Sequence, residues 1–248
     1  MLKERAIILL HGYATDKNDL LVLKEELRKH YSYVCLHNLP GHGDESIKEF
    51  NAIDTMIYVR DLCKRTFERF EHVDIIGFSM GGAITTYLAT IFEFDHVILL
   101  SPANKYLNFN IAPSRVTLFF EYLASRYDKN DVAEAEKKKF DTIVKNDKKS
   151  LKLAINQLLP NYTIHSLKEF KEIIDYCNAH IKGKVCNSKT LLIWGEMDQL
   201  VPQKVIKYLQ PIFPNMEHYI LKDMSHLMLY SDNYEEVTKI IYNFLNIS

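Results

Sequence analysis

Residues 77–81 of the sequence read Gly-Phe-Ser-Met-Gly, a pattern that can carry a nucleophilic serine. The pattern follows a short apolar run at 73–76 and opens a helical one, so Ser79 falls on a sharp strand-to-helix turn. On such a turn the hydroxyl projects from the end of the strand, and the glycines leave room for neighbouring backbone. The N-terminus of the following helix favours developing negative charge. We therefore predict that Ser79 is a nucleophile rather than an idle serine in a glycine-rich turn.

A serine nucleophile requires a base, and the base requires an acid that orients it. In proteins with this strand-serine-helix turn, the acid and then the histidine follow the serine along the chain. Asp198 lies in a loop just after an apolar run at 190–194, and His226 follows the last apolar run. Glu196 is a competing acid, but Asp198 is favoured because the loop must carry the carboxylate across to the histidine. The predicted catalytic residues are therefore Ser79, Asp198 and His226.

Ester or amide chemistry on a serine also requires two backbone N–H groups that bind the carbonyl oxygen as it becomes an anion. One donor comes from the residue after the nucleophile, which is Met80. The other comes from the loop after the first parallel strand, where we predict Tyr13 as the donor and Gly12 as the residue that permits close approach. His11 in the same loop is interpreted as a brace that holds the loop by hydrogen bonding.

Several other histidines are weaker candidates than His226, and none of them indicates a metal site. His218 begins the last apolar run, which predicts a structural position at the opposite edge of the sheet. His165 and His180 lie in helical patterns and are expected to face solvent. His37 and His42 lack further ligands at the spacing typical of zinc sites, so no metal is predicted.

The secondary-structure elements that could position these residues are strands and helices that alternate along the chain. Short apolar runs rich in β-branched residues are typical of strands covered on both faces, and helical patterns separate them. This alternation predicts an α/β fold with a mostly parallel, doubly wound sheet of about six strands. The expected strands are 5–10, 33–37, 73–76, 96–100, 190–194 and 218–221. Besides the helix after Ser79, the expected helices are 18–30, 53–70, 202–209, with Pro202 in its first turn, and 233–245.

One long stretch interrupts the alternation. Residues 104–188 contain helical patterns alone, and the stretch is too long for a structureless loop in a compact domain. We predict a helical cap at 104–188, inserted after the fourth strand of a core formed by 1–103 and 189–248. Its expected helices are 114–127, 131–145, 149–159 and 166–181.

The cap is expected to determine the substrate. Its segment 116–123 is rich in aromatic and aliphatic residues, and one stripe of these must pack on neighbouring helices. The remainder could line an acyl pocket. The candidate substrate-binding residues are Phe119, Phe120 and Tyr122.

Composition restricts the class of protein. The chain has 248 residues, 47% hydrophobic and 25% charged, which is ample for a large core. A formal net charge of -1 gives no electrostatic reason to expect nucleic acid or an anionic membrane as a partner. The four cysteines form no CxxC pair and are read as reduced thiols. The first apolar run is too short for a signal peptide or a membrane span, so a cytoplasmic protein without stable membrane insertion is expected. The oligomeric state stays open.

Taken together, these motifs resemble the α/β-hydrolase superfamily, and within it small bacterial carboxylesterases and monoacylglycerol lipase-like enzymes, a group that includes serine aminopeptidases. The resemblance covers the chain outside the cap, and it implies Ser79 as nucleophile, His226 as general base, Asp198 as its partner, and neither metal nor organic cofactor. Two departures are Asn38, where members often have Asp, and the apparent absence of the usual N-terminal hairpin. The matching residues are His11-Gly12, 40–43 (Pro-Gly-His-Gly), 77–82, 195–202 and Ser225-His226.

The predicted function is hydrolysis of a small-molecule carboxylic ester, of short to medium acyl chain or monoacylglycerol type, through an acyl-enzyme. Three alternatives stay open: a proline-releasing aminopeptidase, a hydrolase of a carbon–carbon bond in a dienoate, and a non-catalytic ligand-binding relative. The carbon–carbon hydrolase would need a basic pocket, which the sequence does not place. A haloalkane dehalogenase is disfavoured because its nucleophile is a carboxylate. The aminopeptidase would need cap carboxylates, for which the candidates are Glu121, Glu134, Glu136, Glu169 and Glu172.

Overall fold

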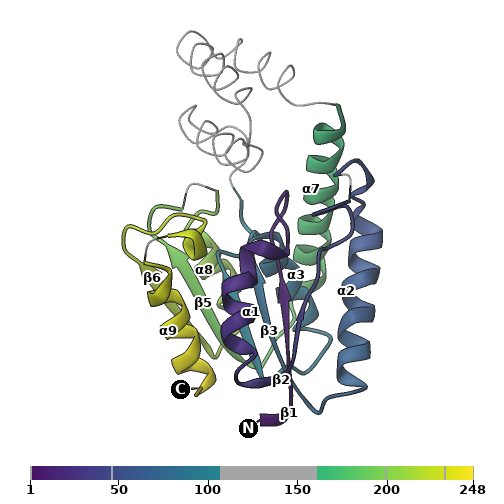
Figure 1. Cartoon of the computed structure of the whole chain (residues 1–248). Coiled ribbons are helices and arrows are strands. Elements are labelled where there is room, and N and C mark those ends of the chain that lie inside the picture. Colours follow the sequence, from purple (N-terminus) through teal and green to yellow (C-terminus); the bar gives the residue numbers. More distant parts are fainter. Residues whose placement is uncertain (1, 46, 107–160, 199, 232, 248) are drawn as a thin grey trace, which may run out of the picture.

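Six strands form one sheet in the order β2-β1-β3-β4-β5-β6 (Figure 1). The computed structural model describes residues 2–45, 47–106, 161–198, 200–231 and 233–247. Every neighbouring pair of strands is parallel, so the predicted doubly wound α/β sheet of about six strands is confirmed. The strands are β1 (Leu2–Leu10), β2 (Tyr31–Leu36), β3 (His72–Phe78), β4 (His96–Leu100), β5 (Lys189–Gly195) and β6 (Met216–Leu221).

Alternate side chains of each central strand enter two separate cores, as a sheet covered on both faces requires. In β1, Ala6 and Ile8 face one core, whereas Ile7 and Leu9 face the other. One face is covered by α2 (Ala52–Phe67), α3 (Met80–Leu88), α7 (Asn161–Ile181) and α8 (Lys204–Leu209), and the other by α1 (Leu21–Leu27) and α9 (Tyr234–Leu245).

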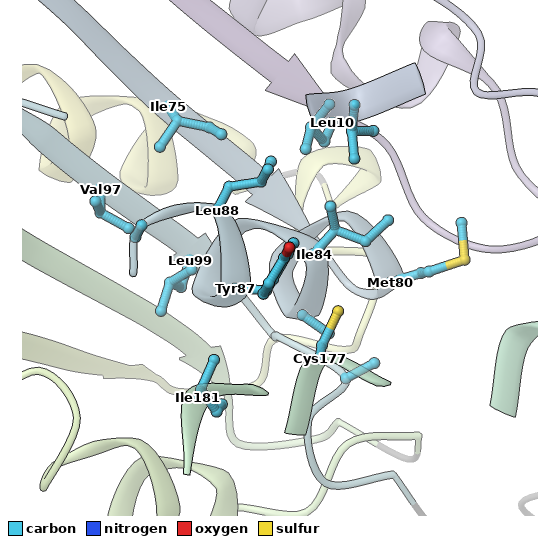
Figure 2. Packing of buried hydrophobic residues seen from close by; sticks show 14 of the residues in the cluster. Leu10, Ile75, Met80, Ile84, Tyr87, Leu88, Val97, Leu99, Cys177 and Ile181 are labelled. Carbon is cyan, nitrogen blue, oxygen red and sulfur yellow. The ribbon is translucent and has the colours of Figure 1, made fainter. Parts of the chain in front are cut away.

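Helix α3 lies at the centre of the larger core. Figure 2 shows Ile84 and Leu88 of this helix among residues of the sheet, with Cys177 and Ile181 of α7 on its other side. All nine residues of α3 are buried. The helix that follows Ser79 is therefore held between the sheet and α7, which fixes the direction of the turn before it.

Some boundaries differ from those expected. The single helix expected at 18–30 is a 3-10 turn, Lys17–Leu20, followed by the shorter α1, and the Asp16 side chain accepts the Asn18 N–H at its start. Helix α8 begins at Lys204, so Pro202 precedes the helix rather than lying in its first turn. Strand β6 begins at Met216, which places His218 mid-strand and exposed instead of at the far edge.

The long segment between β4 and β5 contains α7, which includes the helix expected at 166–181 and begins five residues earlier. The apolar side of α7 is buried against α3, at Ile173, Ile174 and Cys177. Asn104 and Asn178 join the two ends of the segment through hydrogen bonds of 3.0 Å and 2.9 Å. The helices expected at 114–127, 131–145 and 149–159 lie outside the described residues, and the cap limits of 104 and 188 stay a prediction. Among the helices that the structure describes, none has the length and hydropathy to cross a bilayer.

Candidate active site

Ser79 occupies a strained turn between β3 and α3. Its φ of 53° and ψ of -114° lie in a region that L-residues rarely adopt, and such a conformation costs about 1–3 kcal/mol. The surrounding backbone holds it there. The Ser79 N–H donates to the Leu100 carbonyl at 2.9 Å, and its own carbonyl accepts from the N–H of Ala103 at 2.9 Å and of Ala83 at 3.1 Å.

The glycines beside Ser79 are required because a side chain at either position would clash with its neighbours. A Cβ at Gly77 would lie 2.2 Å from Thr85 Oγ1, and one at Gly81 would lie 2.2 Å from the Leu10 carbonyl oxygen. The second contact means that the first turn of α3 is pressed against the end of β1. The glycines therefore provide the space that the sequence pattern predicted for the turn. The close packing of α3 on β1 also brings Ser79 beside the loop that follows β1.

His226 and Asp198 form a buried pair at the same edge of the sheet. His226 Nδ1 lies 2.9 Å from Asp198 Oδ2, and the two side chains are 6% and 0% exposed. Asp198 Oδ1 accepts the N–H groups of Leu200 and Val201, both at 2.8 Å. One carboxylate oxygen is thus fixed by its own loop, and the other faces the imidazole. When Nδ1 donates to this oxygen, Nε2 is left as a proton acceptor.

Direct contact between two loops explains why these residues meet although they are 28 positions apart. The Met197 N–H donates to the Met224 carbonyl at 2.8 Å, and a Cβ at Gly195 would lie 2.4 Å from that same oxygen. The competing acid, Glu196, is exposed, whereas Asp198 is buried. The Phe78 ring, next to Ser79 in the chain, lies 5.1 Å from the His226 ring.

The two predicted oxyanion donors belong to segments that adjoin Ser79. Met80 is the first residue of α3, and the first N–H groups of a helix have no acceptor within it. Tyr13 belongs to the loop after β1. A Cβ at Gly12 would lie 3.2 Å from Ser79 Cβ, so this loop passes directly beside the serine.

His11 holds the loop that carries Tyr13. Its Nε2 accepts the Leu39 N–H at 2.9 Å, so Nδ1 carries the proton and donates to the Gly12 carbonyl at 2.8 Å. Thr15 Oγ1 donates to the same carbonyl at 2.8 Å. These contacts are those of a structural brace, as the sequence interpretation of His11 proposed.

His42 lies in the loop after β2, between two glycines of positive φ, 72° at Gly41 and 74° at Gly43. The His42 ring is buried, with Nδ1 3.0 Å from the Pro40 carbonyl. Burial lowers the pKa of His42, which keeps the ring neutral near pH 7. Within the described ranges, no group of three or more His, Cys, Asp or Glu side chains is arranged to hold a metal ion.

Helix α7 supplies contacts that the sequence analysis missed. Ser166 Oγ lies 2.7 Å from Tyr13 Oη, and the Phe170 ring lies 4.9 Å from the Tyr13 ring. Glu169, a candidate for binding a substrate amine, is buried and accepts the Ala52 N–H at the start of α2. The apolar spacing of Phe170, Ile173 and Ile174 could have shown that this helix buries one face.

Several predicted residues lie outside this description. The candidate pocket residues Phe119, Phe120 and Tyr122, and the carboxylates Glu121, Glu134 and Glu136, fall in the range 107–160, which the structure does not describe. Glu172 is half exposed and lies 3.7 Å from Lys168 of the same helix.

Comparison with known families gives one match over most of the chain. The profile of the family described as alpha/beta hydrolase fold matches residues 5–232. The matched range includes Ser79, Asp198 and His226 together with the loop that carries Tyr13.

Solved structures with the same fold include enzymes of more than one kind. A structure from work on the metagenome-derived lipolytic enzymes LipS and LipT aligns with a TM-score of 0.69 at 14% identity, over 99% of this chain and 95% of that one. An esterase from a marine microorganism has a TM-score of 0.62 at 15% identity, with 95% and 94% covered. The 2-hydroxy-6-oxo-6-phenylhexa-2,4-dienoate hydrolase of Rhodococcus sp. strain RHA1 has a TM-score of 0.66 at 19% identity, with 99% and 92% covered. At these identities the similarity establishes the fold alone.

Proposed function

The chain belongs to the alpha/beta hydrolase fold family, and we propose that it is a serine hydrolase that cleaves carboxylic esters through an acyl-enzyme on Ser79. One observation carries the proposal. A buried His226–Asp198 pair stands at the same sheet edge as a serine held in a strained turn. A strained serine with glycine neighbours and an imidazole oriented by a carboxylate are two parts that serine acyl transfer requires.

In the proposed acylation step, Ser79 Oγ attacks the ester carbonyl carbon while His226 Nε2 takes the hydroxyl proton. The carbonyl π electrons move to the oxygen, and the backbone N–H groups of Tyr13 and Met80 bind the resulting anion. Asp198 stabilises the imidazolium that forms. Collapse of the intermediate breaks the bond to the alkoxy oxygen, and the alcohol leaves with the proton from His226.

Deacylation repeats the sequence with water. His226 takes a proton from a water molecule, whose oxygen attacks the acyl carbon and forms a second tetrahedral intermediate. Its collapse breaks the acyl–Oγ bond, releases the carboxylic acid and returns the proton to Ser79. The net reaction consumes one ester and one water, and it requires no cofactor.

The proposed substrate is an ester of short to medium acyl chain or a monoacylglycerol, covered by the cap that the sequence places at 104–188. A cytoplasmic location is part of the same proposal. The similarity to lipolytic enzymes and an esterase supports the ester class, since these proteins share the fold. The aminopeptidase alternative loses one of its candidate residues, because the buried Glu169 carboxylate already accepts a helix N–H. Fold similarity to a dienoate hydrolase keeps the carbon–carbon alternative as an outcome of the test.

The test is hydrolysis of a p-nitrophenyl ester series, from acetate to laurate, by the wild type and by Ser79→Ala. We expect turnover that depends on acyl length in the wild type, and a loss of about 10⁴-fold or more in the variant. Thermal unfolding of both proteins controls for misfolding. A folded wild type that is inactive on every ester would contradict the proposal and direct the search to proline amides and dienoates.

A further inference from the structure

The side chain of Tyr13 connects the loop after β1 to a distant helix. Tyr13 Oη and Ser166 Oγ are 2.7 Å apart, although the residues are 153 positions apart in the sequence. Ser166 is fully buried in α7, and Tyr13 is half buried. The Phe170 ring, one helical turn further along α7, packs on the Tyr13 ring at 4.9 Å. The phenol is therefore held at its hydroxyl and along its ring by the same helix.

The loop that receives this contact is strained. Ala14, directly after Tyr13, has a φ of 54°, which is unfavourable for a residue with a side chain. A strained backbone keeps its conformation when its surroundings determine it. On one side the loop is braced through His11 and Thr15, whose hydrogen bonds meet at the Gly12 carbonyl. The Tyr13 side chain is the point at which α7 fixes the same loop.

Helix α7 is itself anchored by side-chain contacts where it meets this loop. Glu169, three residues after Ser166, accepts the Ala52 N–H at 2.8 Å and so joins α7 to the start of α2. Ile173 and Ile174 continue the contact into the larger core. A hydroxyl on such a helix can determine where the Tyr13 backbone lies relative to Ser79.

We propose that Ser166 is a positioning residue for the oxyanion hole: by holding the Tyr13 phenol, it aims the Tyr13 backbone N–H at the anionic oxygen of the reacting ester. The inference rests on the proposed function. An interaction that acts on the geometry of the anion contributes to the transition state more than to substrate binding, so its loss lowers kcat and leaves KM nearly unchanged. Ser166 touches neither substrate nor reacting atoms in this role.

The experiment compares Ser166→Ala, Tyr13→Phe and the double variant. Both single changes remove the same hydrogen bond, and Tyr13→Phe keeps the ring on Phe170. We expect kcat on the best p-nitrophenyl ester to fall about five- to tenfold. This is the change in rate that corresponds to the free energy of one hydrogen bond. The double variant should be no worse than either single variant. A second readout, the rate of Ser79 labelling by a fluorophosphonate, depends on the same oxyanion geometry and requires no knowledge of the natural substrate.

Tyr176→Phe is the matched control. It removes another phenol of α7, which lies 3.4 Å from Tyr87 Oη of α3 rather than on the loop after β1. We expect wild-type kcat, KM and labelling rate in this control, and similar melting temperatures in all variants.

The outcomes separate this inference from the proposed function. Unchanged kcat and labelling in Ser166→Ala and Tyr13→Phe would overturn it, as would equal losses in Tyr176→Phe. If Ser166→Ala fails to fold, Tyr13→Phe decides alone. A wild type that is labelled but hydrolyses no ester would contradict the ester proposal, while the labelling rates would still test Ser166. A wild type that is not labelled would overturn both.

Discussion

Buried Asp–His pairs occur at both edges of the sheet, and the two pairs differ in what surrounds them. At the carboxyl edge, where the strands end, Asp198 Oδ2 lies 2.9 Å from His226 Nδ1. At the amino edge, where the strands begin, Asp74 Oδ1 lies 2.8 Å from His96 Nδ1. Both carboxylates are fully buried. The distances alone would not distinguish a catalytic pair from a structural one.

In the amino-edge pair, the Asp74 carboxylate is also bound by other side chains. Asp74 Oδ2 lies 2.8 Å from Arg5 Nε and accepts the Tyr31 hydroxyl at 2.6 Å. Burial by itself would raise the pKa of Asp74, but hydrogen bonds from His96, Tyr31 and Arg5 together lower it below its ordinary value. This carboxylate ties four strands together.

The carboxyl-edge pair has a different set of neighbours. Apart from His226, Asp198 is bound by backbone N–H groups of its own loop, and the strained serine turn ends at the same edge. In open α/β sheets, ligands bind beyond the carboxyl ends of the strands. We therefore expect the pair at the edge with the strained serine to take part in the proposed reaction, and the pair whose acid is neutralised by a cation to contribute to stability.

Among variants of the two Asp–His pairs, Asp198→Asn should have the largest effect on activity. Exchange of this acid for an amide leaves the imidazole in the wrong tautomer, and we expect kcat to fall by about 10⁴-fold with little change in melting temperature. Steady-state kinetics and thermal unfolding measure the two effects. Glu196→Gln is the matched control, because that exposed carboxylate follows the same strand. Loss of activity in the control alone would mean that Glu196, not Asp198, orients the histidine.

Asp74→Asn should have the opposite effects: a large loss of stability and little change in activity. Removing the charge breaks the ion pair between the fully buried Asp74 carboxylate and Arg5, whose remaining anion is Asp95 at 3.9 Å. Breaking a buried pair costs about 3–5 kcal/mol, and because Arg5 is partly exposed and keeps Asp95, we expect the unfolding free energy to fall by about 3 kcal/mol. Urea unfolding measures this loss, and the activity per folded molecule should stay near that of the wild type. A variant that is stable but inactive would mean that the amino edge has a part in the reaction, and would remove the distinction between the two edges.

Sequence reasoning selected residues at the carboxyl edge because the signals there are local. The glycines around Ser79 indicate a turn without room for side chains. Asp198 and His226 each follow a strand at the expected point. The amino-edge cluster was missed, although Asp74 stands in an otherwise apolar strand and therefore needed a partner. Arg5 in β1 and His96 at the start of β4 lie on the two strands that flank β3, and an ionisable residue in each of these apolar runs was the available signal.

The contact between Ser166 and Tyr13 could not be read from the sequence. Periodicity in α7 shows which face is buried, but it does not show which loop that face meets. The burial of β6 was also misjudged from its apolar content. Tyr219 and Ile220 point to opposite faces of the sheet, and each is 43% exposed because β6 is the edge strand and is less covered than the central strands.

Tyr31→Phe tests the amino edge with a smaller change. It deletes the hydroxyl that donates to Asp74 Oδ2 and keeps the ring. A hydrogen bond to a charged group is worth about 1.5–3 kcal/mol, so the unfolding free energy should fall by that amount while kcat stays constant. Tyr219→Phe, on the exposed edge strand, is the control and should change stability by less than about 0.5 kcal/mol. Equal losses in the two variants would contradict a special role for the Asp74 cluster.

Acidification should weaken the amino edge gradually, and this is the smallest effect expected. Since the folded-state pKa of Asp74 is lowered, its charge stabilises the folded protein fully above the ordinary aspartate pKa of about 3.9, and the stabilisation is lost as the pH falls through the lower folded value. The loss is partial, because a protonated carboxyl still fills its site and keeps some hydrogen bonds. Urea unfolding of the wild type and of Asp74→Asn between pH 7 and pH 3 measures it. The gap in unfolding free energy between the two proteins should narrow below about pH 4. A gap that stays constant to pH 3 would mean that the charge of Asp74 does not contribute, and that the amino-edge cluster is held by packing and neutral hydrogen bonds.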